Sequence, residues 1–460
     1  MGSTMHYTDP MKLYVKELGF RTPGTEARFH EIDSARAKHG ADTVIDYASF
    51  GACSDGERQS PAARQAYSLA GLGLTSDYAP EECGSRANVK IETRFGPNTP
   101  AKHIITAAGM LSVMNPDLAR AMVEQEMHVI STRYFRNDEE AVEWARTFGR
   151  WTLISIGIRD PEASYRRAEA VLEAGALGVM LEATHIDCFK AHKLARRIRE
   201  LIETKYKGQG RLLGMGNVDN FGAALRCYMS GAHIVKVGMG SGSICTTRPT
   251  TGTGLPQATA VSEAAAAKSM WNAQVRPEKQ LTIIADGGVR TTKDVLVCLA
   301  LGADTVMSGS FFARTVESAL GSEELFKPYG FDQDVLRAET HGGVILTPNG
   351  GPDIQWAQYD MAAHYFGDAS DECKRRRKVI YGEQLTPGLS PEGDGGYLPV
   401  NYTVAELLAF IEGAVPSAMT LNGVLGVEAF QASNKGRHAV FYVDGGYHLE
   451  SEARVSKNNN

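Results

Sequence analysis

The segment from Gly238 to Arg248, GMGSGSICTTR, places a cysteine where it can do chemistry. Glycines let a backbone turn tightly, and such a turn can hold the Cys245 thiol rigidly at its tip. A positioned and partly deprotonated thiol is a good nucleophile, whereas most cysteines are small buried apolar residues. Gly238, Gly240 and Gly242 also free the backbone to curl, so that successive carbonyls could face inward and ligate a monovalent cation. The segment therefore predicts either a nucleophile or a structural thiol, and its surroundings must decide.

Two further glycine-rich turns suit a phosphate group. The sequence reads ADGG at 285–288 and SGS at 308–310. Backbone N–H groups beside such glycines, at the start of a helix, bind phosphate, and Asp286 can accept hydrogen bonds from ribose hydroxyls. Alone, each could be only a tight turn; together they favour a nucleotide phosphate site.

The elements that must position these turns follow a regular rhythm. Short apolar, β-rich runs alternate with amphipathic helical stretches, which predicts a parallel sheet buried on both faces. The eight predicted strands are 102–108, 127–132, 151–157, 177–183, 211–217, 233–239, 281–287 and 304–310.

Eight such units predict an α/β fold, a (β/α)₈ TIM barrel, with a doubly wound open sheet as the alternative. A barrel carries its chemistry at the carboxyl ends of its strands, which is where the turns described above fall. This agreement favours a nucleophilic Cys245.

Other segments frame the predicted barrel of residues 101–312. We expect an N-terminal extension at 1–100 that packs on the barrel and a long flap at 313–400 after strand eight. Residues 401–460 should form a helix, a hairpin and a tail that complete the barrel and a subunit contact. The boundaries of these segments are the positions at which the alternation of predicted strands and helices ends.

Composition sets broad limits on the class of protein. The chain has 460 residues, 43% of them hydrophobic and 22% charged, with a formal net charge of −6. These values favour a soluble protein, with nucleic acid and membrane surfaces excluded as general partners. Its seven scattered cysteines and the N-terminal sequence predict a reduced, cytoplasmic protein.

The strand-six loop also supports a specific resemblance. GMGSGSICTTR, followed by TGTGLPQATAV, IADGGVRT, LGADTVMSGSFFA and PEG, resembles the IMP dehydrogenase/GMP reductase family over residues 100–450. The resemblance implies a (β/α)₈ barrel acting on a purine nucleoside monophosphate, with NADPH or NAD as cofactor, a potassium ion and a homotetramer. CBS domains, which many of the dehydrogenases insert, are not expected, because one short helix joins strands two and three.

The resemblance also implies roles for individual residues. Cys245 matches the nucleophile that attacks purine C2, and Thr247 the threonine that assists proton transfer. The matches to nucleotide-binding residues are Met110, Ser243, Asp286, Gly287, Gly288, Gly309, Ser310, Tyr365, Gly367 and Glu392. Glu182 and Asn217 match the cofactor side, and the potassium ligands match Gly240, Gly242, Cys245, Asp444, Gly445 and Gly446.

The family runs two reactions, and the flap bears on the choice between them. YFGDASDE at 365–372 resembles the reductase and places Asp371 at its catalytic acid. No adjacent Arg-Tyr pair, the water activator of the dehydrogenase, occurs at 313–400. These features favour an NADPH-dependent GMP reductase that forms IMP and ammonia.

Other sequence motifs favour a reaction different from that of the reductase. SPEGDGG and VDGGYHL look more like the dehydrogenase, which oxidises IMP to XMP with NAD. AAGML at 107–111 and EATHID at 182–187 depart from both forms, so the same chemistry on AMP or another purine nucleotide is a further alternative. A non-catalytic nucleotide sensor is the alternative class, and the Cys-Thr-Thr-Arg loop argues against it.

Overall fold

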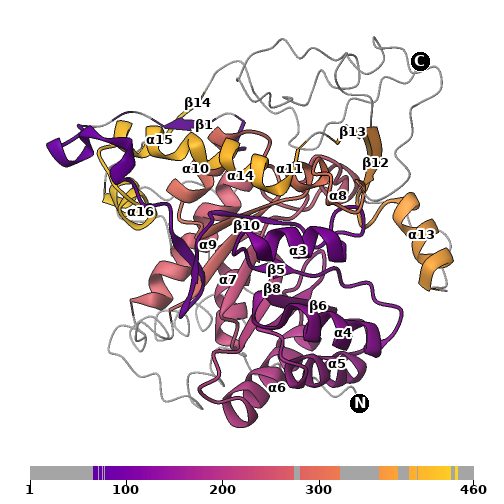
Figure 1. Ribbon diagram of the computed structural model, residues 1–460. Helices are drawn as coiled ribbons and strands as arrows, with labels where there is room; N and C mark the ends of the chain where they lie inside the picture. The colour runs from indigo at the N-terminus through magenta and orange to yellow at the C-terminus, as the bar shows by residue number, and fades with distance from the viewer. Residues whose placement is uncertain are drawn as a thin grey trace, which may run out of the picture.

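An eight-stranded parallel sheet forms the centre of the molecule (Figure 1). The computed structural model describes residues 66–70, 72–74, 76, 78–273, 280–321, 362–381, 393–400, 402–436 and 441–443. The strands, in chain order, are β4 (Ile105–Ala107), β5 (Val129–Ile130), β6 (Thr152–Gly157), β7 (Gly178–Glu182), β8 (Leu212–Val218), β9 (Ile234–Val237), β10 (Thr282–Asp286) and β11 (Thr305–Ser308).

The sheet closes on itself into a barrel. Its spatial order runs β4-β11-β10-β9-β8-β7-β6-β5, with parallel pairing between neighbours. The two end strands meet where the Thr106 hydroxyl donates to the carbonyl of His128 at 3.0 Å. Each strand lies within one of the predicted ranges or one residue beyond it, and the predicted (β/α)₈ barrel is confirmed.

Helices follow the strands and cover the outside of the barrel. Several begin at a side chain that caps the first turn: Asn115, Asn137, Asp160 and Asn220 each accept a backbone N–H. The helices are α3 (Pro116–Glu124), α4 (Asp138–Phe148), α5 (Pro161–Glu173), α6 (Phe189–Lys205), α7 (Phe221–Met229), α8 (Thr247–Thr251), α9 (Gln257–Asn272), α10 (Thr292–Ala300) and α11 (Gly309–Ala313). Only α4 and a short 3₁₀ turn, Gly149–Trp151, join β5 to β6, so no CBS pair is inserted there.

Two apolar layers hold the barrel together. The larger lies between the strands and the surrounding helices. The smaller fills the barrel interior and includes Leu153, Met180, Ile234 and Ile284, with Phe95 closing its amino-terminal end. Phe95 belongs to a hairpin of β2 (Thr93–Gly96) and β3 (Thr99–Ala101). The described end of the N-terminal segment thus packs on the barrel.

The interior rows change from apolar to charged as they approach the mouth of the barrel. Side chains two residues apart on a strand point to the same face. Ile234 in the interior layer therefore leads to Lys236, as Met180 leads to Glu182 and Ile284 to Asp286. Because side chains alternate between the two faces of a strand, these three charged side chains all point inward near the carboxyl ends of their strands.

The flap and the C-terminal segment add smaller units. In the flap, β12 (Ala362–Phe366) pairs with β13 (Gly395–Pro399), and α13 (Asp371–Tyr381) projects beside them (Figure 1). The C-terminal helices are α14 (Val404–Gly413), α15 (Val415–Leu421) and α16 (Val427–Gly436). The last described strand, β14 (Phe441–Val443), pairs with β1 (Leu72–Leu74) from the N-terminal extension. The hairpin expected for this segment falls largely outside the described residues.

One helical stretch in the described chain, Val404–Leu421, is long and apolar enough to span a membrane. It covers α14 and α15, and it packs on the barrel instead of standing apart. Leu407, Leu408, Ile411 and Val415 all belong to the larger apolar core. We therefore assign this stretch to the outer layer of the barrel.

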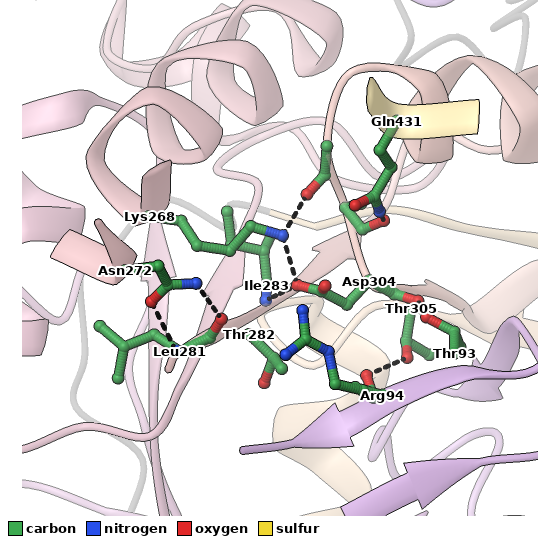
Figure 2. A network of polar contacts seen from close by, with 12 residues as sticks. Thr93, Arg94, Lys268, Asn272, Leu281, Thr282, Ile283, Asp304, Thr305 and Gln431 are labelled. Atoms are coloured by element: carbon green, nitrogen blue, oxygen red, sulfur yellow. Dashed lines mark hydrogen bonds and ion pairs between the residues drawn. The ribbon is translucent and has the colours of Figure 1, made fainter. Parts of the chain in front are cut away.

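A buried polar network secures the end of the barrel opposite the mouth (Figure 2). Lys268 Nζ donates to the Asp304 carboxylate and to the Gly302 carbonyl, both at 2.7 Å. The same carboxylate accepts the Ile283 N–H at 2.7 Å. Because Lys268 is on α9 and Asp304 precedes β11, this ion pair fixes the register between helix and sheet.

Candidate active site

The loop after β9 presents Cys245 at the mouth of the barrel. The Cys245 thiol lies 3.2 Å from the Thr247 hydroxyl, and its backbone N–H donates to the Gly242 carbonyl at 3.0 Å. Gly238 begins the loop with φ +144°, and a Cβ there would lie 1.9 Å from the Asp286 carbonyl oxygen. Only glycine permits this close approach of the β9 and β10 ends, which sets the direction of the loop.

The flap holds the cysteine loop from above. Cys245 and Gly393 form an isolated antiparallel bridge. The Asp394 N–H donates to the Ile244 carbonyl at 2.8 Å, and the Gly367 N–H donates to the Asp394 carbonyl at 3.0 Å. The segment after β12 and the segment before β13 are thus both tied to the cysteine loop.

Three charged side chains form an ion-pair group below this loop. Lys236 Nζ lies 2.6 Å from the Glu182 carboxylate and 3.0 Å from the Asp286 carboxylate. Asn217 adds an N–H donor to Asp286 at 2.9 Å. Burial alone would lower the pKa of Lys236, but the charges of Asp286 and Glu182 raise it above its ordinary value. The lysine is therefore a fixed cation that holds both carboxylates in place.

These groups line one cavity of about 210 Å³. Residues with a predicted role that line it are Met110, Glu182, Asn217, Gly240, Gly242, Cys245, Thr247, Asp286, Gly287, Gly309, Tyr365 and Gly367. The cavity thus gathers loops from β4, β7, β8, β9, β10 and β11 together with the flap. This is the face on which barrels carry their chemistry.

The remaining predicted residues lie elsewhere. Ser243, Gly288 and Ser310 are close in sequence to lining residues but do not line the cavity themselves. Glu392 and the segment 444–446, with Asp444, Gly445 and Gly446, lie outside the described residues.

The position of Asp371 differs from the one expected of a catalytic acid. It is the first residue of α13, its side chain is 66% exposed, and it pairs with Lys374 at 3.2 Å. Asp371 does not line the cavity, whereas Asp368, three residues earlier, does. The turn between β12 and α13 directs Asp368 inward and leaves Asp371 in solvent. The structure therefore moves the acidic candidate from Asp371 to Asp368.

Sequence reasoning missed three charged residues of the cavity: Arg133, Lys236 and Asp368. Lys236 could have been found from the strand period, because it follows Ile234 on the inward face. Arg133 ends a predicted strand at the active face, and Asp368 stands inside the quoted motif YFGDASDE. Both signals were present, but nothing in the sequence says that these two loops meet.

A second cavity of about 820 Å³ adjoins the first, and the two share Arg133, Glu182, Ala183 and Thr184 in their linings. Its cationic lining residues outnumber its carboxylates. The cationic residues are Arg133, Arg159, Arg167, Lys190, Lys374 and Arg377. Such a lining attracts an anionic ligand, and phosphate groups pair well with arginine.

Comparisons with known proteins agree with this geometry. The sequence model of the IMP dehydrogenase / GMP reductase domain matches residues 79–329, more than half of the chain. The chain belongs to the IMP dehydrogenase/GMP reductase family. The family resemblance drawn from the sequence is thereby confirmed.

Individual relatives cover less of the molecule. An inosine-5′-monophosphate dehydrogenase of Chlorobaculum parvum is 32% identical over 282 residues, which are 61% of this chain and 48% of the relative. One from Streptococcus pyogenes is 38% identical over 180 residues, which are 39% of this chain and 33% of the relative. One from Methanocaldococcus jannaschii is 39% identical over 159 residues, which are 34% of this chain and 29% of the relative. The matches therefore span between about a third and a half of each relative.

Family membership gives the two cavities a chemical context. Members of this family are NAD(P)-dependent oxidoreductases that act on purine nucleotides. The cavity beside Cys245 has the polar rim that a nucleotide needs, and the adjoining cationic cavity suits the phosphates of a dinucleotide. Glu182, which lines both, lies where two ligands would meet.

Proposed function

We propose that this protein is a purine nucleoside monophosphate oxidoreductase that works through a covalent bond between Cys245 and purine C2. The observation that carries the proposal is the Cys245 thiol beside the Thr247 hydroxyl, at 3.2 Å, in the wall of the cavity. A hydroxyl at this distance can relay the thiol proton when the sulfur attacks a ligand in the cavity.

The residues around the thiol can bind such a substrate. Asp286 is held by Lys236 and Asn217 with its carboxylate in the cavity wall, where it can accept hydrogen bonds from ribose hydroxyls. Gly287 and Gly309 offer backbone groups at the same rim, and Met110 lines the side nearest Tyr365. A sensor would have no use for a thiol so placed, so an enzyme is the better account.

We propose GMP as the substrate, with IMP and ammonia as products. Asp368 supplies the supporting observation, because removal of ammonia needs an acid near the leaving nitrogen and this carboxyl faces the cavity. The relatives named above are dehydrogenases, so oxidation of IMP to XMP with NAD is the second candidate.

We propose that the cationic cavity holds the phosphates of the dinucleotide cofactor. When bound, the nicotinamide supplies a hydride in the reductase reaction or accepts one in the dehydrogenase reaction. A lining with six cationic side chains favours NADPH, which carries an additional phosphate, over NADH. Arg133 and Glu182 lie at its junction with the substrate cavity.

A potassium ion completes the proposal. The described part of the donor set consists of the backbone carbonyls in the cysteine loop. The Gly242 carbonyl already accepts the Cys245 N–H and keeps a second lone pair for a cation. The donors of the tail would have to be supplied by residues 444–446.

The first test follows absorbance of the reduced cofactor and release of ammonia. In potassium buffer, the protein receives GMP with NADPH, IMP with NAD, or AMP with NAD. We expect absorbance to fall with GMP, with one ammonia released for each NADPH consumed. In Cys245→Ser, turnover should fall by about 10³-fold or more, because a serine hydroxyl is a much poorer nucleophile.

Three results would contradict parts of this proposal. A gain of absorbance with IMP would make the protein a dehydrogenase. Undiminished turnover in Cys245→Ser would exclude the covalent step. Purine nucleotide binding in titration calorimetry, without turnover of any of the three, would favour the sensor.

A further inference from the structure

Most ionisable groups around the cavity already have close partners. Lys236 forms ion pairs with both Glu182 and Asp286. The Tyr365 hydroxyl lies 3.9 Å from the Met110 sulfur. Burial, and the charge of Asp286, raise the pKa of Tyr365 well above its ordinary value, so the phenol keeps its proton. These groups bind and orient, and none is suited to exchange a proton with a substrate.

Asp368 differs because it lines the cavity and only one of its two oxygens accepts a hydrogen bond within the described residues. Its Oδ1 accepts the Leu111 N–H at 3.2 Å. Its Oδ2 has Arg133 at 3.8 Å as its nearest ion-pair partner, which is beyond hydrogen-bond distance. Within the described residues, Asp368 is the carboxyl of this cavity that makes no ion pair with Lys236.

A cluster at the junction of the two cavities holds Arg133 in place. The Tyr134 hydroxyl accepts hydrogen bonds from Arg133 at 2.6 Å and from Arg377 of α13 at 3.4 Å. Both guanidinium groups also lie over the Tyr134 ring, at 4.9 and 4.8 Å from its centroid. Arg133 is thereby fixed between the flap and the barrel, with Asp368 in front of it.

We propose that Asp368 is the acid that protonates the amine leaving purine C2, and that Arg133 and Tyr134 are its positioning residues. This inference rests on the proposed function. The Cys245 sulfur forms a bond to C2, the C2–N bond breaks, and its electron pair stays on nitrogen. The proton of Asp368 passes to that nitrogen, which leaves as ammonia. The proton lost by the thiol restores Asp368 through solvent, so this half reaction needs no oxidant or reductant.

The electrostatics of the pocket agree with an acid at this position. Burial raises the pKa of Asp368, while the cation of Arg133 and the Leu111 N–H partly offset that effect. The negative charge of Glu182 raises this pKa further, and the positive charge of Lys236 lowers it. The carboxyl therefore keeps its proton to higher pH than an exposed aspartate does.

Two matched variants test the role of Asp368. Asp368→Asn keeps the shape but carries no transferable proton, so ammonia release from GMP should slow by about 10²-fold or more. Asp117→Asn changes an exposed aspartate of α3 that lines neither cavity, and we expect its rate to stay within about twofold of the unaltered protein. Equal rates for Asp368→Asn and the unaltered protein would overturn the inference.

A second substrate separates a chemical defect from a misfolded cavity. In 2-chloroinosine 5′-monophosphate, chloride replaces the amine at C2 and leaves without a proton. We expect Asp368→Asn to form the Cys245 adduct from this compound as fast as the unaltered protein, as measured by intact-protein mass spectrometry. Loss of adduct formation in Asp368→Asn would show that the residue supports the cavity itself, and would overturn its role as acid.

The dependence on pH tests the positioning role of Arg133. Ammonia release should fall as pH rises through the pKa of Asp368, and this alkaline limb should be missing in Asp368→Asn. Arg133→Gln removes a cation that lowers this pKa, so its alkaline limb should move to higher pH. An alkaline limb that stays in place in Arg133→Gln would contradict the pairing.

Failure of the proposed function looks different from failure of this inference. If the unaltered protein forms no Cys245 adduct and releases no ammonia, both fail together. If the unaltered protein does both and Asp368→Asn does both equally well, only the role of Asp368 fails.

Discussion

At the scale of single residues, the site depends on a buried cation. Lys236, on β9, is 9% exposed at its side chain and lies between the carboxylates of Asp286, on the adjacent strand β10, and Glu182, on β7. Gly216, on β8, makes room for it, because a Cβ there would lie 2.5 Å from the Lys236 Cβ. Removing one partner of a buried ion pair leaves the other charge uncompensated, which is more costly than the pair is worth.

We therefore predict that Lys236→Met lowers the free energy of unfolding by about 3–5 kcal/mol. Lys102→Met is the matched control, because Lys102 pairs with Glu126 in solvent, and its loss should cost under about 1 kcal/mol. Urea unfolding followed by circular dichroism measures both. A Lys236→Met protein as stable as the control would show that the two carboxylates take up protons or partners elsewhere.

At the scale of elements, a charged histidine joins the first barrel strand to a C-terminal helix. His103, just before β4, lies 2.9 Å from the Glu412 carboxylate of α14 through Nδ1 and 2.7 Å from the Gln125 carbonyl through Nε2. Both ring nitrogens face acceptors, so both carry protons in this arrangement. Burial lowers the pKa of His103, but the hydrogen bond and charge of Glu412 raise it more, and the net shift is upward.

Because the folded pKa lies above the unfolded value of about 6.5, the pair stabilises the protein fully below that pH. The stabilisation is lost as pH rises through the folded pKa. We predict that the stability difference between the unaltered protein and His103→Gln is about 1.5 kcal/mol at pH 6 and shrinks toward zero at alkaline pH. Urea unfolding of both proteins at each pH measures this difference, in which the contributions of the other titrating groups cancel. A difference that grows with pH would contradict the charged pair.

At the scale of the whole molecule, sequence reasoning predicts that the tail of one chain reaches another. VDGGYHL resembles a tail that completes the potassium site of a neighbouring subunit. The described end of this segment, β14, pairs with β1 on the N-terminal side of the same chain. The pairing fixes the start of the tail on the barrel and leaves its function to residues 444–446.

We predict a homotetramer in solution. Light scattering coupled to size-exclusion chromatography, in potassium buffer and over a range of protein concentrations, should give the mass of four chains. A single-chain mass at every concentration would contradict the role assigned to the tail.

The sequence by itself determined the barrel and its family, and it singled out Cys245 as the candidate nucleophile. Strand runs such as HIVKVGM and LTIIADG are continuous and apolar because parallel strands are buried on both faces, so their number and order can be read from local pattern. Cys245 and Asp286 stand at strand ends, and the barrel fold alone brings strand ends to one face.

Only the tertiary structure decided which acidic residue lines the cavity and what surrounds it. Asp368 and Asp371 lie in one short motif, and the turn between β12 and α13 places one in the cavity and the other in solvent. Arg133 and Asp368 are 235 positions apart in sequence, and they meet because the flap folds back over the barrel mouth. Contacts between distant loops depend on the path of the chain in space, which no local residue pattern specifies.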